Sequence, residues 1–466
     1  SSFSFSSNSL ASSFFFIFSL SKKEKNKMKR ISTYWILLGT LLMILACGED
    51  RTYEYEEKTQ HNHWMYDVMR EKYLWAEALA SFEPSWKNYF SAPAQFMATL
   101  TGKSGQKDSW SYVEIDTVNA DSHKRGNFNH IDSYGFDFVL MTDPTGSTTK
   151  SFLRVITVYP GSPAERSGLK RNDYISSFDS YKISKKNITK LQQGPSRELE
   201  ICHLAENEID GSLFWSDTAK IAIGASEYVE DVAFPVSKVI TEGGKRIGYL
   251  MCTRLLDAPE EKPYPEAGVY RRMLDDAMMQ MKAADVEEMV LDLRLCNDGT
   301  IDMAQRLASY VVAPQQVNSM FARTLWNASN AANNKEYPYD ASVDNLGLDR
   351  VYVIIGSYTR GAAEWLIHAL QHTMGVDKVV LIGKPTAGQN VMTEQVAHAY
   401  NIRLYPVVAY VADGGGNYDY GSKTPAVEVD EFGYLQLGEY GTLDEILLYT
   451  AVDDMLNGSH DGSIWD

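Results

Sequence analysis

The sequence predicts a multidomain α/β protein with a helical N-terminal domain, a β-rich middle domain and an α/β C-terminal core. The chain has 466 residues, 44% of them hydrophobic and 12% aromatic, which is enough for two or three domains with sizeable cores. Apolar residues recur at helical spacing up to about residue 101, and short strand-like runs begin at about residue 132. Beyond residue 214, buried strands alternate with helices, which is the pattern of an α/β sheet.

The charge and the cysteines exclude several classes of function. A formal net charge of −17 and a pI near 5.1 argue against nucleic-acid binding, which needs Lys and Arg to neutralise phosphates. The four cysteines show neither a CxxC pair nor a zinc-ligand spacing, and Cys202 and Cys252 lie in apolar runs typical of core residues. We therefore expect no disulfide framework, no metal and no cofactor.

The N-terminal region indicates export. From Met28 the chain reads MKRISTYWILLGTLLMILACGED, a basic start followed by an apolar run too short for a membrane span of ~20 residues. The run closes on ILAC, which resembles a bacterial lipoprotein box with Cys47 as the acylated residue. The resemblance implies a protein anchored by lipid in the bacterial cell envelope, on the periplasmic or the surface face of a membrane. A plain signal peptide and a buried helix are the alternatives.

These features divide the N-terminal region into expected parts. Residues 1–27 are a Ser/Phe/Lys-biased run that we expect not to belong to the natural product. Residues 28–46 are expected to be the lipoprotein signal peptide, and the acidic, polar residues 47–60 a flexible tether.

Residues 61–115 predict a helical N-terminal domain. Its aromatic and apolar residues recur at helical spacing, and two prolines punctuate the segment: Trp64, Val68, Tyr73, Leu74, Trp75, Pro84 and Pro93. The pattern indicates a packing role, and no chemistry is evident.

Residues 130–205 predict a compact β-rich domain. Residues 160–169 read PGSPAERSGL, in which Ser162-Pro163 starts a short helix and Gly168 ends it in a left-handed cap. Asn172 follows, and asparagine tolerates a positive φ better than most residues. The phrase resembles a PDZ domain, a module that binds peptide C-termini by adding a strand to its sheet edge. The resemblance makes Tyr134, Gly135 and Phe136 the candidate loop for the terminal carboxylate.

Residues 214–456 predict the α/β core. Residues 246–251 (RIGYLM) and 289–294 (MVLDLR) read as strands, with a helix between them from about residue 268 to 284. The segment 351–391 then gives a buried strand, a tight turn, an amphipathic helix, a second buried strand and a Gly-rich turn.

This last segment resembles the catalytic core of the C-terminal processing (tail-specific) serine peptidases, and the resemblance extends over most of the chain. That family carries T-A-S-A-S-E at the first turn and G-E-x-T-x-G-K at the second, and it implies a core of the crotonase-like type. The first serine is the nucleophile and the lysine is its base. The matching residues here are Gly361 in TRGAAE and Gln389 in GKPTAGQ. Both catalytic side chains are therefore absent.

A third family motif, D-L-R-x-N-x-G-G, lies on the oxyanion side of that active site. The matching residues 292–299 read DLRLCNDG, so the oxyanion loop includes Asn297, Asp298 and Gly299. Cys296 stands at the family asparagine and Asp298 at the first glycine of the final pair. Because a carboxylate opposes a developing oxyanion, Asp298 agrees with the loss of the Ser–Lys dyad.

Some residues could supply other chemistry. Ser357 and Cys296 are possible nucleophiles, although a turn hydroxyl and a core or loop thiol are the simpler interpretations. Glu364, His368 and His372 share one helix face with room for a metal, but a solvated polar face explains them as well. The main hypothesis is a non-cleaving pseudopeptidase that binds peptide C-termini. An active serine endopeptidase with a substitute nucleophile and a metal-dependent hydrolase are the alternatives.

Overall fold

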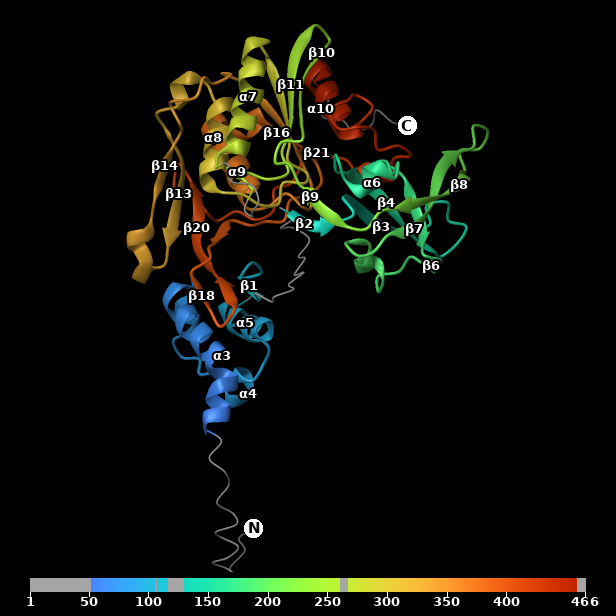
Figure 1. The fold of residues 1–466 in the computed structure, drawn as a ribbon. Coiled ribbons are helices and arrows are strands. Elements are labelled where there is room, and N and C mark those ends of the chain that lie inside the picture. Colours follow the sequence, from blue (N-terminus) through green and yellow to red (C-terminus); the bar gives the residue numbers. More distant parts are fainter. Residues whose placement is uncertain (1–51, 106, 116–129, 260–266, 459–466) are drawn as a thin grey trace, which may run out of the picture. The chain divides into compact units, whose positions relative to one another are not determined.

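The structure is a computed structural model that describes residues 52–105, 107–115, 130–259 and 267–458 (Figure 1). It comprises two compact units, residues 1–61 and residues 62–466. The expectations for residues 1–27, for the signal peptide and for lipidation at Cys47 lie outside the described residues. Within the described ranges, no helix combines the length and the apolar character that crossing a bilayer requires.

The N-terminal domain is helical, as predicted, but it begins earlier and recruits strands from the far end of the chain. Its elements are α3 (Thr52–Lys72), η2 (Ala76–Leu79), α4 (Trp86–Tyr89), α5 (Pro93–Thr101), η3 (Gly102–Ser104) and β1 (Tyr112–Ile115). Residues 52–60, expected in a tether, form the first turns of α3. β1 pairs antiparallel with β19 (Ile402–Tyr405), which also pairs with β18 (Ala397–Ala399). Leu404 is therefore buried in the same apolar cluster as Met69.

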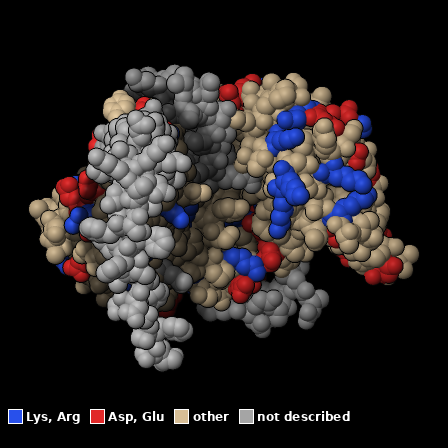
Figure 2. All heavy atoms as spheres, turned by 90° about the horizontal axis from the view of Figure 1, so that it is seen from below, with Lys and Arg blue, Asp and Glu red and all other residues tan. Residues whose placement is uncertain are grey.

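The middle domain is built on a six-stranded antiparallel sheet. Its elements are β3 (Phe136–Thr142), β4 (Ser151–Val158), α6 (Pro163–Arg166), β5 (Tyr174–Phe178), β6 (Tyr181–Lys182), η4 (Ile188–Leu191), β7 (Arg197–Glu206) and β8 (Leu213–Ile223). The strand order is β3-β4-β5-β7-β8 with β6 beside β5, so β3 is an edge strand among the described residues. In Figure 2, Lys and Arg side chains gather on the right-hand part of the view.

Local devices predicted from the sequence are present in this domain. The Ser162 hydroxyl caps α6 by accepting from the backbone N–H of Glu165. Gly168 and Asn172 both have a positive φ, 83° and 78°.

The predicted domain boundary is wrong. β8 was expected in the core from residue 214, but it pairs with β7 along its whole length, from Arg197↔Ile223 to Glu206↔Leu213. A two-stranded ribbon of β2 (His130–Ser133) and β9 (Glu227–Glu230) follows it.

The core contains a six-stranded sheet that is covered on both faces. Its order is β10 (Val236–Glu242), β11 (Lys245–Met251), β12 (Glu288–Asp292), β15 (Val351–Ile355), β16 (Val379–Gly383) and β21 (Val427–Glu428), parallel from β11 onward. The helices α7 (Val269–Ala283), α8 (Ile301–Val311) and α9 (Ala362–Met374) pack on one face and α10 (Ile446–Asn457) on the other. Burial on both faces explains why these strands are continuous apolar runs. The strands predicted at residues 246–251 and 289–294 and the helix between them are confirmed.

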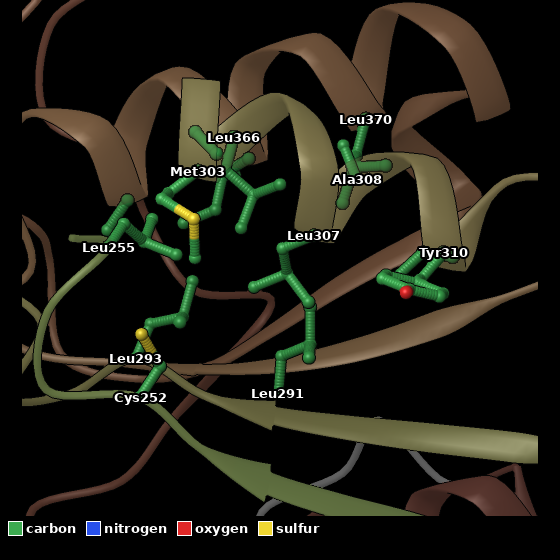
Figure 3. Close-up of a cluster of buried hydrophobic side chains, with 14 of the residues drawn as sticks. Cys252, Leu255, Leu291, Leu293, Met303, Leu307, Ala308, Tyr310, Leu366 and Leu370 are labelled. Carbon is green, nitrogen blue, oxygen red and sulfur yellow. The ribbon is translucent and has the colours of Figure 1, made fainter. Parts of the chain in front are cut away.

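A second, four-stranded sheet completes the core. Its order is β14 (Glu336–Pro338), β13 (Met320–Trp326), β20 (Val407–Asp413) and β17 (Val391–Thr393). The remaining elements are the short helices η5 (Pro314–Gln316), η6 (Ala328–Asn333), η7 (Val376–Lys378) and η8 (Glu431–Gly433). Figure 3 shows side chains of α8 and α9, among them Leu307 and Leu366, above Leu291 of β12 and Leu293, which follows that strand. This packing holds the start of α9, where the candidate site lies.

Candidate active site

The first turn of the site joins β15 to α9 at Gly361. Gly361 has φ 58° and ψ −119°, a conformation that residues with a Cβ rarely adopt. The buried Thr359 hydroxyl donates to the Leu293 carbonyl at 2.8 Å and accepts from the Gly356 N–H at 2.9 Å. Arg360 donates its backbone N–H to the Cys296 carbonyl at 3.1 Å. The turn is thereby fixed against the loop that follows β12.

The second turn, which follows β16, is held by a buried carboxylate from α9. Glu364 accepts a hydrogen bond from the Thr386 hydroxyl, and it accepts the backbone N–H groups of Gly388 and Gln389 at 2.7 and 2.6 Å. Burial raises the pKa of Glu364, and the three hydrogen bonds oppose that shift. The expectation of a solvated face at Glu364 is therefore wrong: its side chain is fully buried because the second turn covers it.

The two positions matched to the Ser–Lys dyad lie opposite each other. A Cβ atom at position 361 would lie 3.4 Å from Oε1 and 3.8 Å from Nε2 of Gln389. The Gln389 side chain donates to the Val391 carbonyl at 3.2 Å, and its backbone carbonyl accepts from the Trp365 indole at 3.1 Å. A glycine and an anchored amide thus occupy the place of a nucleophile and its base.

The third element, the oxyanion loop, is closed by its own carboxylate. Asp298 accepts the Gly299 N–H on Oδ1 at 2.7 Å, and its Oδ2 lies 3.6 Å from Nη1 of the buried Arg254. Burial raises the pKa of Asp298, whereas Arg254 opposes the shift. Gly299 packs so tightly that a Cβ there would come within 2.9 Å of the Cβ of Ala362, the residue after Gly361. Asn297 faces the same region with a buried Oδ1 that has no hydrogen-bond partner among the described residues.

Beneath the loop, the retained Asp292 and Arg294 form part of a buried ion network. Arg294 contacts Asp292 at 2.7 Å, Glu431 at 2.9 Å and Glu445 at 2.8 Å. These carboxylates raise the pKa of Arg294 against the opposing effect of burial. Because all its polar atoms point to structural partners, Arg294 supports the loop and is not itself available for chemistry.

The alternative nucleophiles are not arranged for catalysis. Ser357 lies in an exposed turn, as the simpler interpretation predicted. Cys296 is fully buried, and its sulfur lies 3.7 Å from that of Cys252. Burial raises the pKa of the Cys252 thiol well above its ordinary range, which keeps that thiol protonated.

The proposed metal triad does not converge. Glu364 is committed to the second turn, whereas His368 Nε2 and His372 Nδ1 each lie 3.4 Å from Oδ2 of Asp413. In the part of the chain that the structure describes, no three His, Cys, Asp or Glu side chains are placed to hold a metal ion.

A half-buried lysine near the site, Lys423, was missed by the sequence interpretation. Lys423 donates its ammonium to His368 Nδ1 at 3.0 Å and to Gln371 Oε1 at 3.2 Å, and its backbone N–H donates to Thr386 Oγ1 at 2.7 Å. Burial lowers its pKa to about 8. His368 lies seven residues beyond Gly361, a rise of about 10 Å along a helix, so this ammonium does not replace the base at position 389. No motif surrounds Lys423, and only the folded chain reveals it.

The candidate peptide loop lies between β2 and β3. The Tyr134 hydroxyl donates to the Pro195 carbonyl at 2.5 Å, and the Gly135 N–H donates to the Ser133 hydroxyl at 3.0 Å. Gly135 has φ 79°, and a Cβ there would lie 2.1 Å from that of Ser162, so only glycine fits. Phe136 opens β3, which is an edge strand among the described residues and follows the loop directly.

Comparisons with known proteins show which family this chain is similar to. Residues 246–424 match the family model of peptidase family S41, and residues 60–112 match that of the peptidase S41 N-terminal domain. Among solved structures, a protein of Bacteroides fragilis NCTC 9343 assigned to the S41 proteases has 29% sequence identity and a TM-score of 0.73. That alignment covers 85% of this chain and 97% of the other. No curated protein matches.

Two further structures have lower scores. The photosystem II D1 C-terminal processing protease has 16% identity and a TM-score of 0.44, covering 80% of this chain and 93% of its own. Mature CPAF complexed with lactacystin has 12% identity and a TM-score of 0.47, covering 87% and 99%. Two regions of this chain are therefore similar to domains of peptidase family S41, and the Bacteroides fragilis structure shows a similar fold over most of the chain.

Proposed function

We propose that this chain is a lipid-anchored envelope pseudopeptidase that binds peptide C-termini without cleaving them. In this proposal, the sheet β3–β8 is a PDZ domain, the core is of the crotonase-like type, and Cys47 carries the anchor. No metal or cofactor takes part.

The opposition of Gly361 and Gln389 carries the proposal. A Ser–Lys peptidase needs a hydroxyl directed at the scissile carbonyl and a neutral amine in hydrogen-bond reach that accepts its proton. Gly361 has no side chain, and the Gln389 amide is not basic near neutral pH. Loss of the nucleophile alone lowers turnover by roughly 10⁶ in a well-studied serine protease.

The oxyanion loop supports the same conclusion. Asp298 occupies the Gly299 N–H and adds a carboxylate where the reaction would develop negative charge. Removing one oxyanion donor costs on the order of 10²–10³ in turnover, and a carboxylate that is even partly ionised adds repulsion. The substitution therefore acts in the same direction as the loss of the dyad.

Peptide binding is supported by parts of the chain that the substitutions in the active site do not affect. The free edge of β3 offers backbone groups for strand addition directly after the Tyr134–Phe136 loop.

The deciding experiment compares the parent with two restored variants. One carries Gly361→Ser and Gln389→Lys, and the other adds Asp298→Gly. We expect the parent to bind C-terminal peptides in fluorescence anisotropy, to leave a fluorogenic peptide library intact and to resist fluorophosphonate labelling. The triple variant should gain cleavage, and more than the double variant.

A matched control separates restored chemistry from a changed fold. The control carries Gly361→Ala together with Gln389→Lys and Asp298→Gly. It places a Cβ on the same backbone but supplies no hydroxyl, so it should remain inactive. Cleavage by the parent, abolished by mutation of this cleft, would refute the pseudopeptidase proposal.

The half-buried Lys423 favours one alternative, an active serine endopeptidase with a substitute nucleophile. A pKa of about 8 leaves part of this lysine neutral at physiological pH, as a general base requires. This alternative predicts a serine that reacts with a fluorophosphonate on intact mass and loses that reaction in Lys423→Met. An unlabelled parent protein would eliminate it.

The anchor is tested separately. Metabolic labelling with a palmitate analogue should modify the parent protein and should fail in Cys47→Ser. A labelled Cys47→Ser variant would place the lipid elsewhere.

A further inference from the structure

A cluster of lysines lies beside the candidate peptide groove. Four lysines and no acidic residue fall between Tyr181 and Leu191, in a chain whose formal net charge is −17. The lysine cluster consists of Lys182, Lys185, Lys186 and Lys190, and all four side chains are exposed. None of the first three forms an ion pair with another described residue. A local excess of positive charge on an acidic protein indicates a selective contact with an acidic partner.

The segment that carries the cluster borders the loop before β3. Gln192, directly after η4, accepts the backbone N–H of Tyr134 at 3.4 Å. Leu191 belongs to the same buried cluster as Phe136 and Phe138, and Ile188 packs at its margin. The segment that carries the lysine cluster therefore adjoins the candidate carboxylate loop, and its apolar residues pack with the first residues of the edge strand β3.

The backbone around the cluster is held in place. The Asn187 side chain accepts the Ser184 N–H at 2.9 Å and donates to the Lys182 carbonyl at 2.8 Å. A preorganised loop presents its charges with little ordering cost when a partner binds.

Neighbouring acidic groups do not neutralise the cluster. Asp179 pairs with Arg197 at 2.6 Å, and Glu198 pairs with Lys220 at 2.6 Å. The Debye length is about 8 Å at physiological ionic strength, so the lysine cluster acts on charges of a peptide that lie within about that distance of it.

We infer that this groove selects peptide C-termini that carry acidic residues upstream of the terminal carboxylate. The inference rests on the peptide-binding function proposed above and adds the chemical class of the ligand. A strand added along β3 would place its upstream side chains in reach of the lysine cluster. An anionic membrane would also attract lysines, but it would not use the adjoining edge strand β3.

The test uses the full chain and fluorescein-labelled decapeptides with one shared apolar C-terminal residue. Their upstream positions are acidic, neutral or basic, and an acidic peptide with an amidated C-terminus is included. We expect the acidic peptide to bind at least tenfold more tightly than the neutral one at 50 mM salt, with the ratio shrinking at 500 mM. Amidation should weaken binding of the acidic peptide.

Two charge variants locate the effect. Lys182→Gln, Lys185→Gln, Lys186→Gln and Lys190→Gln together should abolish the preference by weakening the acidic peptide far more than the neutral peptide. The control variant removes four exposed lysines elsewhere, with Lys87→Gln, Lys103→Gln, Lys335→Gln and Lys378→Gln, and should keep the preference.

The outcomes separate the two proposals. Equal binding of acidic, neutral and basic peptides would overturn the charge selectivity and leave C-terminal binding standing. Absence of binding to every peptide would remove the proposed function and the inference with it. Co-sedimentation with phosphatidylserine vesicles that depends on the lysine cluster, without any peptide preference, would assign the cluster to a membrane and overturn the inference.

Discussion

Gly361 has a backbone conformation that a residue with a Cβ adopts only with strain. The absence of the nucleophile therefore also removes a local destabilisation of the fold. We expect Gly361→Ala to lower the free energy of unfolding by about 1–2 kcal/mol, because its φ of 58° and ψ of −119° disfavour a Cβ. Urea denaturation measures this. Gly421→Ala is the control, since nothing lies within 4 Å of its Cβ position and its φ is not positive. Equal stability of the two variants would show that position 361 carries no strain.

Lys423 should make the free energy of unfolding depend on pH in the alkaline range. Its pKa of about 8 lies below the ordinary 10.5, so between these values the folded chain holds fewer protons than the unfolded chain. Stability should therefore rise with pH across this window, by up to about 0.7 kcal/mol per unit from pH 8 to 9.5 after allowance for partial exposure. Urea midpoints at several pH values should lose this slope in Lys423→Met and keep it in Lys378→Met. If the slope is unchanged in Lys423→Met, the pH dependence of stability comes from another titratable group.

At the residue scale, the sequence supplied the most information where a motif fixed the alignment. The opposition of Gly361 and Gln389 followed from two turns with known spacing. The burial of Glu364 could not be predicted in this way. The i, i+4 and i+8 spacing shows which residues share a helix face, but not which segment covers that face. The partners of Lys423 were hidden for the same reason.

At the scale of elements, α9 supports both turns of the site through its packing on the sheet. We expect Leu366→Ala, at a fully buried position, to destabilise the fold by about 2–5 kcal/mol through lost burial and a cavity. Thermal or urea unfolding provides the measurement. Met279→Ala on α7 is the control because its side chain is 63% exposed, and it should be nearly neutral. A small effect at Leu366 would mean that the neighbouring side chains close the cavity.

The sequence predicted elements with a strong local period, including β15, α9 and β16. It missed the assignment of β8 to the middle sheet and the pairing of β1 with β19. Both depend on contacts between strands, which leave no periodic signal in either partner. The pairing of Val113 with Leu404 joins positions almost 300 residues apart along the chain.

At the scale of the whole molecule, Glu431 forms ion pairs with one arginine of the middle domain and one arginine of the core. It accepts Arg171 of the middle domain at 3.2 Å and Arg294 of the DLR motif at 2.9 Å. Glu431→Gln should weaken both contacts, and we expect several-fold faster hydrogen exchange in residues 171–175 and 292–299. Glu439→Gln, at an exposed glutamate nearby, should leave exchange unchanged. Faster exchange in only one segment would show that the two contacts are independent.

The hydrogen bond between Asp298 and the Gly299 N–H has an evolutionary consequence under the proposed function. Recovery of cleavage needs a hydroxyl at 361, an amine at 389 and the removal of the carboxylate at 298. Each change alone leaves the other two defects in place, so selection for turnover has no single step to reward. A serine at 361 would even be penalised by its backbone. Under the proposed function, recovery of peptidase activity would need three substitutions together, so the chain is expected to remain a binding protein.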